Sequence, residues 1–303
     1  MNQIIAVLLV FASSIFAGAR AEEVKIPFQG LTLVGNLEMA EGKSLKDGVI
    51  VTVHGNMAHY GMEMIEALQG IGKERGYNTL AINLSLGVNE RHGMHDCTLP
   101  QTHRRQDAIN ELGAWIDWLK SKGAKNVVLE GHSMGANQVA LFMAERNPDL
   151  VRVIVLLAPT TWDNEHVAKS YAARGGRELK PTMDRAHALV EAGKGETMMP
   201  DTQFLTCANN ATVSAASFAS YYTTAPDRDT PNLIARIKKP VLVLAAQNDT
   251  IHYKVAEKFA PVADGERVRV KTIDGADAFF RDLYAEDAVD AILEFVAAHP
   301  GST

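Results

Sequence analysis

The sequence predicts an α/β protein with a doubly wound, mostly parallel sheet and an inserted helical cap. Three observations predict it: short apolar runs recur along the chain, amphipathic helical segments separate them, and one long stretch shows only helical patterns. Apolar runs without alternation are typical of strands that are covered on both faces, as in parallel sheets. An alternating order of such strands and helices favours the doubly wound arrangement.

The strands are predicted in chain order. Residues 23–28 and 31–39 form an antiparallel pair that turns at Gln29-Gly30. The buried strands follow as six apolar runs, over 49–53, 80–82, 127–129, 153–157, 241–244 and 268–272. Between and after them, apolar side chains at helical spacing predict helices over 108–119, 136–143 and 288–296.

The stretch from Pro159 to Pro231 breaks this order, because it contains no strand-like run. Residues 164–173, 182–192 and 214–222 have helical patterns. A structureless loop of this length is improbable inside a compact domain. We therefore expect a helical cap at about 159–231, inserted into a single α/β domain over 22–303.

Residues 1–21 resemble a signal peptide. The apolar stretch from Ile4 to Phe16 is too short to span a bilayer, and Ala19-Arg20-Ala21 is a small-x-small cleavage signature. Export to the periplasm or the medium follows, with no stable membrane association after cleavage. The segment before the apolar stretch has no Lys or Arg, so an uncleaved N-terminal anchor stays an alternative.

Charge and cysteine content limit the partners. The formal net charge is −6 at pH 7 and Lys/Arg runs are missing, which argues against nucleic acid as a partner. Cys97 and Cys207 are the only cysteines, and in an oxidising compartment two cysteines suit one disulfide. Two buried thiols, or one thiol near an active site, remain alternatives.

Gly131-His132-Ser133-Met134-Gly135 is the most informative motif, since it lies between a predicted strand and a predicted helix. A strand that turns abruptly into a helix brings backbone segments close together, and glycine fits there. This turn exposes Ser133 at a helix N-terminus, where the Met134 N–H is free to stabilise an oxyanion. Asn56, which follows His54-Gly55 at the end of another strand, is predicted to supply the second N–H. His54 itself is predicted to brace its loop.

A serine nucleophile needs a base, and the base needs a group that orients it. Asp249 follows the strand at 241–244, where a carboxylate at the edge of the sheet is placed to orient an imidazole. A role for Asp249 in capping the next helix is the structural alternative.

With these motifs in this order, residues 45–298 resemble the α/β-hydrolase family. The resemblance implies an eight-stranded, mostly parallel sheet with a cap, and a triad of Ser133, Asp249 and a late histidine. It also implies a small acyl substrate such as an ester, and no cofactor is expected.

The chain departs from the family at Ala278, where many relatives carry the catalytic histidine. Three hypotheses follow: the alanine was introduced to inactivate the enzyme, activity was lost naturally, or the base has moved. The substitute base would be His252, three residues after Asp249, or a histidine in the loop after the second apolar run.

That loop also contains His92, His95 and Cys97, whose spacing permits a zinc site. No helical pattern fixes the spacing, so we predict no metal site. The loop also fits a polar rim to the mouth of the active site, which the alternative of a Cys97–Cys207 disulfide would join to the cap.

The sequence therefore predicts an exported serine hydrolase for a carboxylic ester or similar small acyl substrate, impaired because the base is missing at Ala278. A non-catalytic protein that binds a ligand in the same pocket is the alternative.

Overall fold

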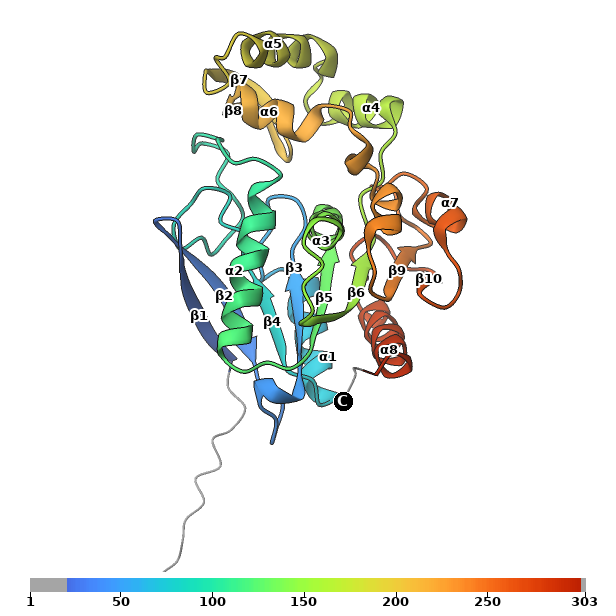
Figure 1. Cartoon of the computed structure of the whole chain (residues 1–303). Helices are drawn as coiled ribbons and strands as arrows, with labels where there is room; N and C mark the ends of the chain where they lie inside the picture. The colour runs from blue at the N-terminus through green and yellow to red at the C-terminus, as the bar shows by residue number, and fades with distance from the viewer. Residues whose placement is uncertain (1–20, 301–303) are drawn as a thin grey trace, which may run out of the picture.

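The computed structural model describes residues 21–300 (Figure 1). The predicted signal peptide, apart from Ala21, lies outside the described residues. Within residues 21–300, no helix has the length and apolarity needed to cross a bilayer.

The centre of the molecule is an eight-stranded sheet with the order β1-β2-β4-β3-β5-β6-β9-β10. The strands β1 and β2 form the predicted antiparallel hairpin, β2 also pairs antiparallel with β4, and every other neighbouring pair is parallel. The predicted fold class is confirmed. The bounds are β1 Ala21–Phe28, β2 Leu31–Glu38, β3 Val49–Val53, β4 Thr79–Ile82, β5 Val127–His132, β6 Val151–Leu157, β9 Val241–Ala246 and β10 Val268–Ile273.

Helices cover both faces of the sheet (Figure 1). On one face α2 (Asp107–Ser121) and α3 (Met134–Glu145) share an apolar cluster with the central strands. On the other face α1 (Glu63–Glu74) and α8 (Leu283–Ala298) share a second cluster. Because both faces are covered, all five residues of β3 are buried, which is why its sequence does not alternate. The short elements are α7 Val255–Phe259, η1 Leu45–Asp47, η2 Pro226–Arg228, η3 Thr230–Arg236 and η4 Ala260–Val262.

The cap lies between β6 and β9 and covers one end of the sheet (Figure 1). It contains the three expected helices, α4 Asn164–Gly175, α5 Leu179–Glu191 and α6 Ala215–Tyr222. The expectation of a cap without strands is wrong, since β7 (Met198–Phe204) and β8 (Cys207–Ser214) form an antiparallel hairpin. Pro200 and Asp201, the latter at φ 51°, interrupt the alternation in β7, and the pairing shifts register there.

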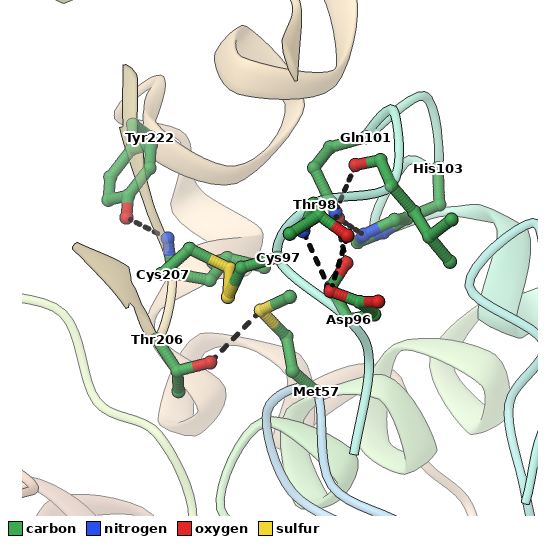
Figure 2. Close-up of a disulfide and its surroundings, with 11 residues drawn as sticks. Met57, Asp96, Cys97, Thr98, Gln101, His103, Thr206, Cys207 and Tyr222 are labelled. Carbon is green, nitrogen blue, oxygen red and sulfur yellow. Dashed lines mark hydrogen bonds between the residues drawn. A yellow bond between two sulfur atoms is a disulfide. The ribbon is translucent and has the colours of Figure 1, made fainter. Parts of the chain in front are cut away.

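A disulfide between Cys97 and Cys207 joins the loop after β4 to strand β8 of the cap (Figure 2). The two sulfurs lie 2.01 Å apart and the two Cα atoms 5.6 Å apart. Gln101 of the same loop exchanges backbone hydrogen bonds with Thr212 and Ser214 in β8. Cys97 therefore has no free thiolate for a metal, and residues 21–300 contain no group of three His, Cys, Asp or Glu side chains arranged to hold one.

Candidate active site

The turn between β5 and α3 holds Ser133 at φ 55° and ψ −119°, a strained conformation for a residue with a side chain. Close backbone packing imposes it. A Cβ atom on Gly131 would lie 2.6 Å from the Gly135 backbone, and one on Gly135 would lie 2.3 Å from the carbonyl oxygen of His54. The two glycines of the motif are therefore needed for this close approach.

His252 lies against Ser133. The Ser133 Oγ is 2.8 Å from His252 Nε2, and His252 Nδ1 is 2.7 Å from Asp249 Oδ2. If Nδ1–H donates to the carboxylate, Nε2 carries the lone pair that accepts the Ser133 hydroxyl hydrogen. The His252 and Asp249 side chains are 5 % and 6 % exposed, so their hydrogen bond is shielded from water. Serine, imidazole and carboxylate thus form one continuous chain of hydrogen bonds.

Local structure brings Asp249 and His252 together. Both lie in the loop after β9, where Asp249 Oδ1 accepts the backbone N–H groups of Ile251 at 2.8 Å and of His252 at 2.9 Å. This turn folds the His252 ring back over the other carboxylate oxygen. Burial by itself would raise the pKa of Asp249, but the hydrogen bonds and charge interaction with His252 outweigh it and lower that pKa. Asp249 is therefore ionised at neutral pH, as an orienting group requires.

Ala278 lies in the loop after β10 and is 2 % exposed. Its backbone carbonyl accepts a hydrogen bond from His132 Nε2 at 2.7 Å, so this loop is tied to the serine turn through its main chain. The methyl side chain of Ala278 has no titratable group, so it cannot act as a base. The structure brings His252 to Ser133, as the moved-base hypothesis expects, and gives position 278 an anchoring contact.

The histidines of the loop after β4 do not take the position of a base. His92 pairs with Glu23, while His103 is buried against Tyr221 and Gln101. His95 is buried beside His103, with ring centroids 5.3 Å apart. Within the described residues, His252 is the histidine that contacts the Ser133 oxygen.

The two predicted oxyanion donors flank Ser133. Asn56 and Met134 both line the cavity around it, and within residues 21–300 neither backbone N–H has a hydrogen-bond partner. Met134 is the first residue of α3, so its N–H also lies at the positive end of the helix dipole. These N–H groups can donate hydrogen bonds to a carbonyl oxygen on which negative charge develops.

His54 braces the loop that carries Asn56, as predicted. Its Nδ1 donates to the Gly55 carbonyl at 2.7 Å, and its Nε2 accepts from the Leu84 N–H at 3.1 Å and from Arg91 at 2.8 Å. Burial, followed by the nearby Arg91 charge, holds the pKa of His54 well below its usual range. A neutral ring with both nitrogens occupied cannot serve as the base.

The cavity above Ser133 has a volume of about 600 Å³ and is lined by residues from the sheet edge and the cap. Its aromatic walls include Phe279, Tyr221 and Tyr222. Sequence reasoning leaves Tyr221 and Tyr222 undecided between pocket lining and core packing, and it gives Phe279 no role. Nothing in their local pattern distinguishes them from core residues. Phe279 does, however, directly follow Ala278, the position at which many relatives carry the catalytic histidine. The resemblance to the family therefore implies that Phe279 lies near the serine.

Comparison with known proteins identifies the fold and the family. Residues 45–277 match the family model described as "Serine aminopeptidase, S33". No curated protein sequence matches the chain significantly.

Solved structures share the fold at low identity. Est1E from Butyrivibrio proteoclasticus, with bound ferulic acid, is 18 % identical with a TM-score of 0.64, over 91 % of this chain and 98 % of that one. The Pyrococcus furiosus esterase Pf2001 is 18 % identical with a TM-score of 0.56, over 92 % and 90 %. A dienelactone hydrolase from Anabaena variabilis is 14 % identical with a TM-score of 0.55, over 93 % and 98 %. With a family model that matches most of its length and an α/β-hydrolase fold, the chain belongs to the serine aminopeptidase S33 family of α/β-hydrolases.

Proposed function

We propose that the protein is an active, exported serine hydrolase that cleaves a carboxylic ester with a small or medium acyl group. Ser133 is the nucleophile, His252 the general base and acid, and Asp249 the group that orients His252. The observation that carries the proposal is the hydrogen-bond chain from Ser133 Oγ through His252 to Asp249, with contacts of 2.8 Å and 2.7 Å. Nucleophile, base and orienting group within this reach are the signature of covalent acyl transfer.

The steps follow from these positions. Ser133 Oγ attacks the ester carbonyl carbon while its proton passes to His252 Nε2, and the carboxylate of Asp249 stabilises the imidazolium. The carbonyl oxygen becomes an oxyanion, which the N–H groups of Asn56 and Met134 bind. The intermediate then expels the alcohol, which takes the proton from His252. A water, deprotonated by His252, attacks the acyl-serine. His252 then returns the proton to Ser133 Oγ as the bond to the acyl group breaks and the acid leaves.

This proposal differs from the expectation of impaired catalysis, which depended on the missing histidine at position 278. A base at 2.8 Å from the serine oxygen satisfies the reach that proton transfer requires, wherever it lies in the sequence. The non-catalytic alternative depended on the same missing base, so the contact between His252 and Ser133 weakens it equally.

Export to the periplasm or the medium is part of the proposal. Its support is the pattern of residues 1–21 together with the Cys97–Cys207 disulfide, which suits an oxidising compartment.

The test compares four variants with the wild type by fluorophosphonate labelling and by hydrolysis of p-nitrophenyl butyrate. The variants are Ser133→Ala, His252→Ala, Ala278→His and, as a control, His299→Ala, whose ring bonds its own helix at the Phe295 carbonyl. We expect wild-type turnover, no labelling of Ser133→Ala, and a loss on the order of 10⁴-fold in kcat for His252→Ala. The control should behave like the wild type.

Two outcomes would contradict the proposal. An inactive wild type that becomes active in Ala278→His would restore the missing-base hypothesis. Wild-type activity that survives in His252→Ala would place the base elsewhere.

A further inference from the structure

We propose that Thr161 is a positioning residue for the proposed reaction, because it links the turn that holds Ser133 to the loop that carries His252. The inference rests on the proposed function and adds a residue that acts through the base. Thr161 lies in the connection that leads from β6 into the cap, and it is 5 % exposed.

The loop that carries His252 has no regular secondary structure between the end of β9 and the start of α7. Asp249 fixes the first half of this loop through the two N–H groups and the imidazole that it binds. After His252 the chain reverses at Lys254, whose φ is 50°. Contacts at Asp249 do not determine where the chain goes after the base, so the second half of the loop needs an anchor of its own.

Thr161 supplies this anchor. Its Oγ1 donates a hydrogen bond at 2.5 Å to the backbone carbonyl of Tyr253, the residue directly after His252. Because Thr161 is buried, removing its hydroxyl would leave that carbonyl without a donor that water can readily replace. A second contact between the cap and this loop, from His166 Nε2 to the Ile251 carbonyl, is longer at 3.4 Å.

The connection that carries Thr161 is also bonded to the serine turn. The Leu157 carbonyl accepts the Ser133 N–H at 2.9 Å, and the Thr160 N–H donates to the Ser133 carbonyl at 3.3 Å. The backbone of the nucleophile is therefore bonded to the residues that lead directly into Thr161. One short segment thus holds the nucleophile through its main chain and the base loop through a side chain.

The residue after Thr161 is fixed as well. Asp229 Oδ1 accepts the Trp162 N–H at 3.0 Å, and Lys258 Nζ donates to the Trp162 carbonyl at 2.6 Å. Lys258 and Asp229 also form an ion pair at 2.6 Å. Lys258 belongs to α7, which follows the base loop, so both contacts hold the same two segments together. Thr161 is therefore a rigid support for the position of His252.

The physical consequence concerns the rate of the chemical step. Proton transfer requires His252 Nε2 within hydrogen-bond reach of Ser133 Oγ, and a displacement of about 1 Å can lower a rate on the order of 100-fold. Loss of the Thr161 hydroxyl releases the chain beside His252 without removing a group that takes part in the reaction. We therefore expect the effect in kcat and not in KM.

The test compares Thr161→Val and Thr161→Ser with the wild type on p-nitrophenyl butyrate. Valine keeps the branched shape and removes the hydroxyl, whereas serine keeps the hydroxyl. Thr202→Val is the matched control. Thr202 is also 5 % exposed and its hydroxyl donates to the Met199 carbonyl at 3.0 Å, but it lies in β7 and outside the cavity lining.

We expect Thr161→Val to lower kcat by about 10- to 100-fold, to change KM less than about 2-fold and to slow fluorophosphonate labelling of Ser133 by a similar factor to kcat. Thr161→Ser should stay within about 3-fold of the wild-type kcat. Thr202→Val should lose as much stability in urea denaturation as Thr161→Val and keep the wild-type kcat. In the His252→Ala background, Thr161→Val should not lower kcat further, because the group through which it acts is gone.

A wild-type kcat in Thr161→Val, a change in KM alone, or an equal fall of kcat in the His252→Ala background would overturn the inference. Failure of Thr161→Ser to restore kcat would overturn it too. If Thr161→Val does not fold, Lys258→Met tests the same link through Trp162, and an unchanged kcat in that variant would also count against the inference. An inactive wild type contradicts the proposed function itself, whereas an active enzyme that needs His252 but not Thr161 contradicts only this inference.

Discussion

Removal of the disulfide by the double substitution Cys97→Ser and Cys207→Ser should destabilise the protein strongly. The two cysteines are separated by 110 residues. In the chain-entropy model, closing a loop of that length lowers the entropy of the unfolded chain enough to stabilise the fold by about 5 kcal/mol at 25 °C. The double substitution avoids a leftover thiol that could form wrong disulfides.

The assay is urea denaturation of the wild type and the double variant, followed by circular dichroism. The backbone bonds between Gln101 and β8 are present in both proteins, so they do not offset the loss. We therefore expect a loss of 2–5 kcal/mol in the free energy of unfolding, the usual cost of removing a native disulfide. A change below about 1 kcal/mol in the free energy of unfolding would show that the disulfide does not stabilise the fold by lowering the conformational entropy of the unfolded chain.

Three further substitutions test other parts of the structure. Burial raises the pKa of Glu130 from 4.5 to about 7, so the folded state retains a proton that the unfolded chain loses and stability falls as pH rises from about 4.5 through about 7. Glu130→Gln should match the wild type at pH 4 and be more stable by about 3 kcal/mol at pH 8 in thermal denaturation, and an equal difference at both pH values would refute this. Gly135→Ala should lower kcat/KM at least about 100-fold, because its Cβ would lie 2.3 Å from the His54 carbonyl; near-normal kinetics would mean that the turn can relax. Asp249→Asn should lower kcat about 10⁴-fold by favouring the wrong tautomer of His252, and steady-state rates near wild type would remove its orienting role.

The sequence was most informative where one local pattern has one structural solution. The run from Val127 to Leu129 followed by the motif around Ser133 predicted a strand, a tight turn and a helix, and β5 and α3 follow that order. The cap hairpin was missed because Pro200 and Asp201 break the alternation that identifies strands, while register shifts let the strands pair nonetheless. Its stability comes from contacts with distant residues, which a local pattern does not contain.

The candidate site likewise contains features that local sequence patterns predict and features that depend on contacts between distant residues. Sequence by itself predicted the serine turn, the oxyanion loop and the carboxylate at the end of a buried strand, because strand ends, glycine-lined turns and helix starts are all local features. It also identified Ala278 as the position where many relatives carry the catalytic histidine, because a resemblance to a family is read position by position along the sequence.

Only the tertiary structure showed which histidine lies within hydrogen-bond distance of Ser133. Proton transfer depends on the distance between two atoms, and Ser133 and His252 are 119 residues apart in sequence but 2.8 Å apart in space. The Asp249 turn after β9 and the serine turn after β5 meet at one edge of the sheet, where the parallel strands end. That meeting brings His252 to the serine and leaves position 278 to anchor the loop that carries Phe279.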